Sequence, residues 1–321
     1  MSPTRSKRPD DVAQAARVHA IVVTWEGAHL IGDCLRSLAA QDLEAPARLA
    51  VTVVDNGSTD GTAELVAREF PSAILIARAD NAGFGRATNE GLGRALAAGA
   101  DYALLVNNDV ELEPGFVRAL VAAADAHPRA GLLTGTLLFR GEERVNSTGL
   151  LIDALGRARD RDFGLLRSQL ARPDGPVAGV SGGAALLRCA MLRQIGCFDA
   201  DYFAYYEDVD LSLRAARAGW HSWYVAAATA RHRYSATIGD GSPQKRFLLG
   251  HGHLRTLAKH QPPLRALALV PLAAGYRLLA KAPLELLRGR PALAMAEARA
   301  SMTGLWSALG ALALRGLRRD R

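Results

Sequence analysis

Through its first 140 residues the chain alternates short apolar runs with segments of helical spacing, and this alternation limits the fold more than any other feature. Apolar, β-branched runs predict buried strands at residues 19–25, 51–54, 73–77 and 102–106. Helices are expected at residues 30–38, after a cap at Thr59 or Asp60, at residues 86–98, and from Pro114 onward. Strands that alternate with helices favour an α/β fold with a mostly parallel central sheet and helices on both faces.

The second half of the chain is less regular. Residues 156–175 are rich in Arg, Asp and Gly, which predicts a mobile loop. Strands are expected at residues 180–187 and 221–225, and a helix at 208–218. After about residue 245 we expect the chain to be wholly helical. We therefore expect a disordered N-terminal arm (residues 1–18), an α/β domain (residues 19–245) and a basic helical C-terminal extension (residues 246–321).

Two polar clusters follow predicted strands, at the end of the sheet where ligands bind in such folds. Asp55-Asn56-Gly57-Ser58 follows the second strand, and Asn107-Asn108-Asp109 follows the fourth. Hard divalent cations take oxygen ligands, and Mg²⁺ commonly uses only one or two carboxylates together with substrate phosphates. Asp109 is therefore a candidate cation ligand, although an ordinary turn also explains this cluster.

Glu207, Asp208 and Asp210 place three acids in four residues at the start of a predicted helix. A carboxylate at a helix N-terminus is favoured by the helix dipole, so a simple cap is the plain interpretation. Like charges raise one another's pKa while the helix terminus keeps at least one group ionised, which suits a general base. The aromatic residues 202–206 precede these acids and suit a sugar.

His232 lies between Arg231 and Arg233, beyond a predicted strand. A neutral imidazole is a good ligand for transition-metal cations, and the two flanking guanidinium groups could contact phosphate. The alternative is an exposed histidine in a basic stretch.

Other nucleotide-binding and hydrolase motifs are weak or missing. Gly83-Phe84-Gly85 begins a dinucleotide motif, but Thr88 occupies the place of the third glycine and no strand of a Rossmann unit precedes it. The sequence contains no GxxxxGK[ST] phosphate loop and no GxSxG nucleophile elbow. A P-loop enzyme and a common serine hydrolase are therefore disfavoured.

Cysteine usage and the N-terminus predict a protein of a reducing compartment. Cys34, Cys189 and Cys197 form no CxxC pair, so we expect three packing residues rather than a disulfide or a zinc site. The N-terminal residues lack the apolar run of a signal peptide. The longest late charge-free run, residues 300–314, would form a helix of about 22 Å, short of the roughly 30 Å of a membrane core.

The excess of positive charge lies in the C-terminal part of the chain. The net charge is +7, yet residues 255–321 hold 12 Lys and Arg against 3 Asp and Glu. Residues 264–314 are rich in Leu and Ala, are interrupted by Pro271 and Pro283, and carry several arginines. Such helices can lie on an anionic membrane surface. The alternatives are a helical cap on the main domain and an interface between copies of the chain.

Taken in order, several segments resemble family 2 glycosyltransferases with the GT-A fold, and specifically the rhamnosyltransferase-like bacterial branch. The resemblance covers about residues 19 to 260. It is carried by IVVTW at residues 21–25, VVDNGSTDGT at 53–62, NAGFGRATNEG at 81–91, LLVNNDVELEPG at 104–115, VSGGAALLR at 180–188, FDADYFAYYEDVDLSLRAARAGW at 198–220, and the segment around His232.

The resemblance implies roles for individual residues. Residues 19–110 would form the nucleotide-sugar half of the domain, and residues 111–245 the acceptor half. Asp109 would be the metal-binding acid, His232 would bind the metal or the diphosphate, and Asp208 would be the catalytic base with Glu207 beside it. The expected donor contacts are Thr24 and Asp55 at the nucleobase and ribose, Asn56 nearby, and Asn81, Gly83, Asn89 and Asn108 around the rest of the donor.

Two departures from the family pattern stand out. The metal motif reads Asn107-Asn108-Asp109 instead of Asp-x-Asp, so one carboxylate should hold the cation weakly until the diphosphate adds its oxygens. The first strand ends Thr24-Trp25-Glu26, where relatives commonly show an aromatic residue followed by Asn.

These observations predict an inverting glycosyltransferase that needs Mg²⁺ or Mn²⁺. Its donor would be a nucleoside-diphosphate sugar such as dTDP-rhamnose or a UDP-sugar, and its acceptor a saccharide or a lipid-linked saccharide. We expect a cytoplasmic protein, peripheral on the inner face of the cell membrane, that does not bind nucleic acid. The alternatives are a sugar-nucleotide pyrophosphorylase, which would carry a basic Gly-rich loop at residues 25–28, and a nucleic-acid-binding protein acting through its basic tail.

Overall fold

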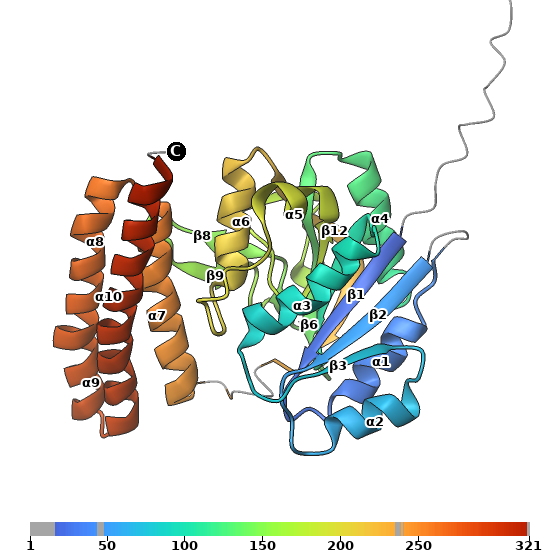
Figure 1. Ribbon diagram of the computed structural model, residues 1–321, viewed down its shortest axis with the longest axis horizontal. Coiled ribbons are helices and arrows are strands. Elements are labelled where there is room, and N and C mark those ends of the chain that lie inside the picture. Colours follow the sequence, from blue (N-terminus) through green and yellow to red (C-terminus); the bar gives the residue numbers. More distant parts are fainter. Residues whose placement is uncertain (1–16, 44–47, 235–238, 240, 320–321) are drawn as a thin grey trace, which may run out of the picture.

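The computed structural model describes residues 17–43, 48–234, 239 and 241–319. An α/β domain occupies most of this range, and a group of C-terminal helices lies along one side of it (Figure 1). The predicted N-terminal arm falls mainly outside the described residues. Its last two residues, Arg17 and Val18, begin the first strand instead.

The central sheet is mostly parallel at one end and mixed at the other. Strand β1 (Arg17–Thr24) pairs in parallel with β2 (Arg48–Asp55) and β4 (Tyr102–Asn107), and β3 (Ile74–Ala77) extends the sheet beyond β2. The order continues through β11 (Ala184–Arg188), β6 (Ala130–Phe139), β12 (His221–His232) and β10 (Gly175–Val177). The short strands β5 (Val110–Leu112) and β7 (Val145–Ser147) pair with β12 and β6, and β8 (Leu150–Ile152) with β9 (Ala158–Asp160) forms a separate hairpin.

Helices cover both faces of the sheet because its strands are apolar on both sides. Along β1, Ala20 and Val22 pack under α1 (Ile31–Ala39), α2 (Thr62–Glu69) and α4 (Phe116–Ala126). Ile21, between them, faces the opposite side, where α3 (Phe84–Ala97), α5 (Cys189–Ile195) and α6 (Glu207–Arg217) lie. This alternation follows the period of two of a strand. The predicted fold class is confirmed.

The middle of the chain is more ordered than its composition indicates. The predicted loop at residues 156–175 contains β9 and a 3₁₀ turn at Arg167–Gln169. Asp162 anchors this region, since it pairs with Arg172 and accepts a hydrogen bond from Thr148 at 2.6 Å. The predicted mobile loop therefore contains short regular elements, and long-range polar contacts join it to the rest of the domain.

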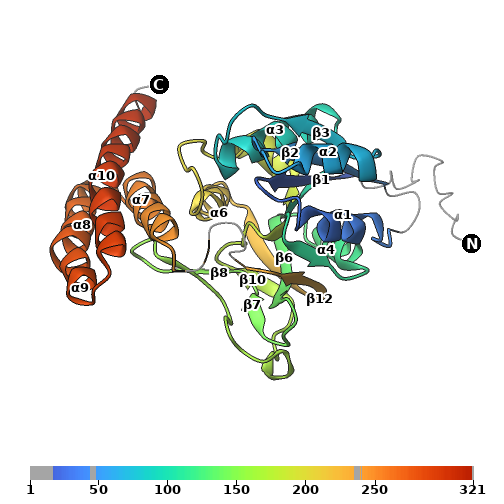
Figure 2. The same ribbon diagram turned by 90° about the horizontal axis from the view of Figure 1, so that it is seen from below.

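Five helical segments make up the C-terminal extension, as expected. They are α7 (Pro243–His260), α8 (Pro263–Tyr276), the π-helical turn η2 (Arg277–Lys281), α9 (Ala282–Leu287) and α10 (Pro291–Arg319). Figure 2 shows α8, α9 and α10 beyond α7, with α7 nearest the main domain. An apolar core that includes Leu254, Val270 and Ala308 holds the group together.

Neither Pro271 nor Pro283 ends the helix in which it lies. Pro271 lies inside α8, and Pro283 lies at the start of α9, directly after the π-helical turn η2. Residues Pro263–Leu287 thus run as one 25-residue helix, whose most apolar window has a hydropathy of 1.3 and is 17% buried. By length and composition alone this helix could cross a membrane, which the expectation drawn from residues 300–314 did not foresee.

The three cysteines are free. Cys34 and Cys189 are buried in the two cores of the sheet, and Cys197 is half-buried. Burial raises the pKa of the Cys189 thiol to about 11, and it raises that of Cys34 further. The prediction of packing residues is confirmed.

Candidate active site

A cavity of about 860 Å³ opens at the carboxyl ends of β1 and β4. Its walls come from segments far apart in the chain: the ends of these two strands, the start of α6, the β8–β9 hairpin, the end of β12 and the first turns of α7. Asp109, Asp208 and His232 all line it. The sequence predicted that these three side chains share one opening, and the structure places them there.

Asp109 and His232 form one corner of the cavity. Asp109 lies in the turn between β4 and β5, and β5 pairs with β12 so that His232 is opposite Val110. The His232 imidazole donates its Nδ1–H to Asn146 Oδ1 at 2.8 Å, because an amide oxygen can only accept. Its Nε2 lies 3.2 Å from Asp109 Oδ1.

This corner fits a divalent cation. A carboxylate oxygen can only accept, so either a proton on His232 Nε2 or a cation must lie between the two atoms. Two adjacent ligands of an octahedral ion at about 2.1 Å are about 3 Å apart, close to the separation of Asp109 and His232. Within the described residues no group of three or more His, Cys, Asp or Glu side chains could hold a metal ion. A cation here would therefore depend on oxygen atoms of a substrate.

Other polar side chains of the cavity are held by one another. Asn56 Nδ2 donates to Asn81 Oδ1 at 2.9 Å, and Asn108 Nδ2 donates to Thr24 Oγ1 at 2.9 Å. Gly83 begins α3 with a φ of 84°, and a Cβ on it would lie 2.5 Å from the carbonyl oxygen of Phe203. Five of the seven predicted donor contacts line the cavity: Thr24, Asn56, Asn81, Gly83 and Asn108.

Two other predicted donor contacts lie outside the cavity lining. Asp55 is 2% exposed, accepts a hydrogen bond from the Ser58 hydroxyl, and has its pKa raised by burial. Asn89 bonds both backbone groups of Phe198, donating to its carbonyl and accepting from its N–H, each at 2.9 Å. Both side chains have a local structural partner, and Asp55 still lies beside a predicted donor contact, because Thr24 is its register partner in the β1–β2 pair.

Glu207 and Asp208 open α6 at the cavity wall. Asp208 Oδ2 accepts from the Gly182 N–H at 3.0 Å, and its Oδ1 accepts from the Val209 N–H at 2.8 Å. Burial raises the pKa of Asp208 to about 6, against the lowering effect of these donors, and the charge of Asp160 adds to the rise. Burial and the charge of Asp208 raise the pKa of Glu207 well above its usual value.

The third acid of this group has a different environment. Asp210 is fully buried and turned away from the cavity, where it pairs with Arg214, Lys259 and His260. Burial alone would raise its pKa, but the hydrogen bond from His260 and the charges of Lys259 and Arg214 hold it well below the usual range. The three acids therefore lie in two different environments: Glu207 and Asp208 at the cavity, and Asp210 among buried cationic partners.

The arginines beside His232 do not face the cavity. Arg231 pairs with Glu143 at 2.9 Å, and Arg233 pairs with Asp33 at 3.3 Å. Successive side chains of a strand point to opposite sides, so both guanidinium groups leave the side on which His232 lies. The structure does not support their expected contact with phosphate.

The sequence missed several residues of the cavity wall. Asp160, Phe163 and the glycines of Ser181-Gly182-Gly183 line it, as do Tyr234 and Lys245. Asp160 lay within the predicted loop, and Lys245 lay at the predicted domain boundary. The long-range packing of the β8–β9 hairpin and of α7 brings both to the site.

Sequence comparison identifies related proteins. A family model described as "Glycosyltransferase like family 2" matches residues 15–246. The N-acetylglucosaminyl-diphospho-decaprenol L-rhamnosyltransferase of Mycobacterium tuberculosis is 32% identical over 240 residues, which cover 68% of this chain and 76% of that protein.

Solved structures of low sequence identity share the fold. The mannosyltransferase PcManGT of Pyrobaculum calidifontis, in complex with GDP-Man and Mn²⁺, superposes with a TM-score of 0.58 at 19% identity, over 94% of this chain and 91% of that one. The S. aureus TarS fragment 1–349, in complex with UDP, superposes with a TM-score of 0.54 at 16% identity, over 95% and 92%. At these identities the likeness shows the fold alone.

Proposed function

The chain belongs to glycosyltransferase family 2, and from this premise we propose that it transfers a sugar, with inversion, from a nucleoside-diphosphate sugar to a hydroxyl of a saccharide or lipid-linked saccharide. The observation that carries the proposal is the meeting of Asp109, His232 and Asp208 in one cavity. It supplies both a corner suited to a cation and a carboxylate suited to a base.

Asp109 and His232 would hold Mg²⁺ or Mn²⁺. The cation, when bound, neutralises the charge that develops on the departing nucleoside diphosphate. The hydrogen bond from His232 Nδ1 to Asn146 fixes the ring so that Nε2 is free to bind metal, which is how proteins commonly orient a histidine ligand. With so few protein ligands, cation and diphosphate would bind together.

Asp208 would act as the base that takes the proton from the acceptor hydroxyl. A pKa of about 6 leaves it ionised at neutral pH and makes it a stronger base than an ordinary aspartate. The N–H groups of Gly182 and Val209 orient its two oxygens. Glu207 lies beside it, with an oxygen, Oε2, that has no hydrogen-bond partner within the described residues.

Thr24, Asn56, Asn81, Gly83 and Asn108 would bind the nucleotide of the donor. Their amide and hydroxyl groups already position one another, so little ordering is needed on binding. The printed name of the mycobacterial relative specifies rhamnosyl transfer. We therefore propose dTDP-rhamnose as the donor to test first, with UDP-sugars as alternatives.

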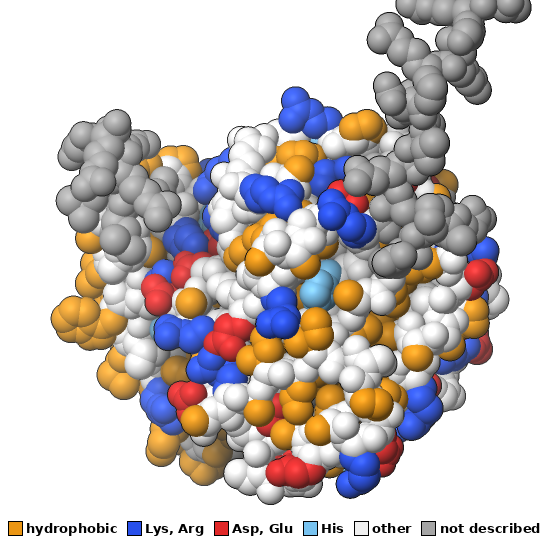
Figure 3. All heavy atoms as spheres, turned by 45° about the vertical axis from the view of Figure 1, so that its right-hand side comes forward, with side chains coloured by type: hydrophobic (Ala, Val, Ile, Leu, Met, Phe, Trp, Pro, Cys, Tyr) orange, Lys and Arg blue, Asp and Glu red, His pale blue; other side chains and the backbone are white. Residues whose placement is uncertain are grey.

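The extension supports a peripheral location at the cytoplasmic face of a membrane. One face of α8 packs through Ala266, Val270 and Ala274, while leucines such as Leu264 and Leu272 are exposed on the other. Hydrophobic side chains gather on the C-terminal helices at the left edge of Figure 3. Because this helix is packed on one side, we propose that it lies in the membrane surface and does not cross it. A lipid-linked acceptor would then lie near the site.

Substitution at the cation corner tests the proposal. We expect Asp109→Asn and His232→Ala each to weaken Mn²⁺-dependent binding of a nucleoside diphosphate at least tenfold, measured by calorimetry, and to abolish transfer. Glu111→Gln is the matched control, since Glu111 lies in the same short strand but pairs with Arg140. Tight, Mn²⁺-dependent binding in all three variants would remove the assigned corner.

Two further measurements, a calorimetric binding screen and an assay for nucleotide-sugar formation, test the alternative functions. Binding of oligonucleotides, with no binding of nucleoside diphosphates, would favour the nucleic-acid-binding alternative. Formation of a nucleotide sugar from a sugar phosphate and a nucleoside triphosphate would favour a pyrophosphorylase.

A further inference from the structure

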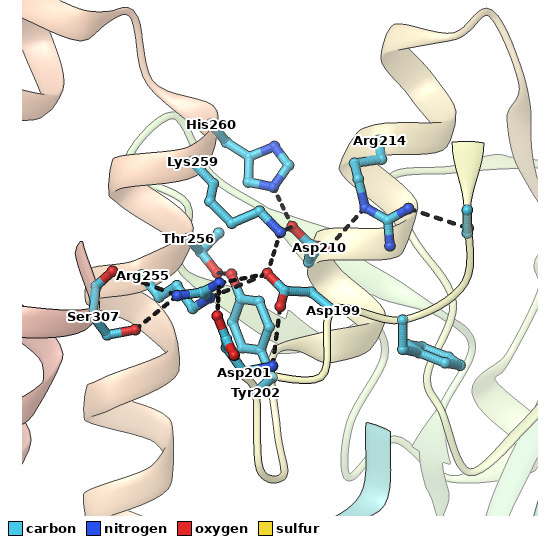
Figure 4. A network of polar contacts seen from close by, with 12 residues as sticks. Asp199, Asp201, Tyr202, Asp210, Arg214, Arg255, Thr256, Lys259, His260 and Ser307 are labelled. Carbon is cyan, nitrogen blue, oxygen red and sulfur yellow. Dashed lines mark hydrogen bonds and ion pairs between the residues drawn. The ribbon is translucent and has the colours of Figure 1, made fainter. Parts of the chain in front are cut away.

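The cavity wall that carries Asp208 is held at both of its ends by the C-terminal extension. This wall segment, residues 199–210, contains the cavity-lining residues Phe203 to Asp208. Residues before and after that stretch turn outward and contact α7. Figure 4 shows these contacts as one connected network.

At the start of the wall segment, α7 contributes the guanidinium group of Arg255 and the hydroxyl of Thr256. Arg255 Nη2 lies 2.9 Å from Asp199 Oδ2 and 2.6 Å from Asp201 Oδ2. The Tyr202 hydroxyl shares a 2.8 Å hydrogen bond with Thr256 Oγ1. Arg255 is nearly buried, which makes its charged contacts stronger than surface pairs of the same geometry.

At the end of the wall segment, α7 holds Asp210. The Lys259 ammonium lies 2.6 Å from Asp210 Oδ1, and His260 Nε2 lies 2.7 Å from the same oxygen. Lys259 also lies 2.6 Å from Asp199 Oδ2. One ammonium group therefore bridges both ends of the wall segment.

Between these ends the backbone is strained. Tyr205 and Tyr206 both have left-handed backbone angles, with φ of 66° and 72°, directly before Glu207. For residues with a side chain, such conformations cost of order 1 kcal/mol or more each and persist only where the surroundings impose them. Helix α7 also touches this turn directly: a Cβ on Gly252 would lie 2.9 Å from Tyr206 Cβ and 3.1 Å from the Tyr205 carbonyl oxygen.

We propose that α7 positions the catalytic wall, and that Lys259 is its central positioning residue because it bridges Asp199 and Asp210. The bridge holds the strained Tyr205–Tyr206 turn and keeps the start of α6, with Asp208, directed into the cavity. This role rests on the proposed function for its effect on catalysis. The positioning itself is a property of the fold and can be measured separately.

The test compares Lys259→Met with Lys259→Arg, in the full chain. Glu297→Gln is the matched control, because Glu297 is a fully buried acid of the extension whose partners Arg246 and Arg277 also belong to the extension. Amide hydrogen exchange of residues 203–209 should rise at least tenfold in Lys259→Met. It should return near the wild-type rate in Lys259→Arg and stay unchanged in Glu297→Gln.

Kinetics provide the second measurement. We expect Lys259→Met to lower kcat at least tenfold, with the KM for the donor within about twofold, and to shift the acidic limb of the pH profile. Lys259→Arg should recover most of the rate. If Lys259→Met does not fold, Asp199→Asn, at a half-buried position, should give the same effects.

The outcomes separate the two proposals. Unchanged exchange at residues 203–209 in Lys259→Met, with only a lower melting temperature, would show a merely structural ion pair and overturn the inference. Raised exchange in a protein whose wild type transfers no sugar would support the positioning role and reject the proposed function.

Discussion

The environment of Asp208 raises the pKa of its carboxyl group. Its carboxylate is half-buried at the cavity wall and close to two other acids, Glu207 and Asp160, while backbone N–H groups, including those of Gly182 and Val209, stabilise its charge. A carboxylate in such a place keeps its proton to a higher pH, which is the usual way in which proteins prepare a base for neutral conditions.

The rate of sugar transfer should follow the ionisation of Asp208. Because the pKa of Asp208 is raised to about 6, the base form predominates above pH 6 and disappears as the pH falls through that value. We expect kcat to drop about tenfold for each pH unit below about 5.5. A pH series of initial rates measures this, and a profile that stays flat from pH 7 to pH 4.5 would contradict the assignment.

Asp208→Asn is the companion variant. It should lower kcat by about 10²–10⁴-fold while donor binding is largely retained. Since the folded-state pKa lies above the usual value of about 4, the folded protein binds more protons between about pH 4 and 6, and stability falls as the pH rises through that window. The variant should therefore be more stable than wild type at pH 7, by about 1 kcal/mol, in chemical denaturation.

At the scale of elements, several short polar links hold the secondary structure around the cavity. The start of α3 contacts the wall segment, since the Phe84 N–H donates to the Phe203 carbonyl at 2.6 Å. One turn further along α3, Asn89 bonds both backbone groups of Phe198, just before the wall. These contacts explain why residues 81–91 form a recognisable motif although only some of them line the cavity.

Asn89→Ala tests whether this residue serves the fold or the donor. Removing its amide leaves two backbone groups of Phe198 unpaired, which should cost about 2 kcal/mol of stability. We expect a lower melting temperature and a nearly unchanged KM for the donor. Asn81→Ala, at the cavity, is the control and should raise that KM. A large rise in KM for Asn89→Ala would instead return Asn89 to the donor site.

At the scale of the whole molecule, the extension has two different sides. Its inner helix, α7, contacts the wall segment through charged groups, while the outer helix formed by residues 263–287 exposes leucines. Leu264, Leu272, Leu279 and Leu287 are each at least 68% exposed. Their spacing of seven or eight residues corresponds to about two helical turns, which puts them on one face.

Replacing these four leucines with serine should abolish membrane binding. Each leucine that enters the lipid boundary contributes up to about 2 kcal/mol, so the loss should be complete in flotation with anionic vesicles. The control replaces Leu165 and Leu166, half-exposed leucines of the main domain, and should float like wild type. If the fourfold variant also floats with the vesicles, the membrane contact lies elsewhere or is absent.

Some features of the site that were not predicted follow from local geometry. Asp208 and Asp210 are two residues apart in a helix, so their side chains point about 200° apart and cannot both face one cavity. Arg231 and Arg233 flank His232 in a strand, so they face the opposite side. Applying these two periods to the sequence would have separated the cavity residues from their neighbours.

The sequence by itself determined the fold class and the three central residues of the candidate site. Apolar periodicity is a local property, and parallel strands bring the polar residues at their carboxyl ends to one edge, so Asp109 and the asparagines near it could be predicted to lie there. Tertiary structure alone decided that Asp160 and Lys245 join the cavity and that Asp55 and Asn89 do not line it. It also decided that Lys259 of α7 bridges Asp199 and Asp210 at the two ends of the wall segment. These contacts join residues as far apart in the chain as Asn89 and Phe198, which are separated by 109 positions, and their geometry depends on packing that no local pattern encodes.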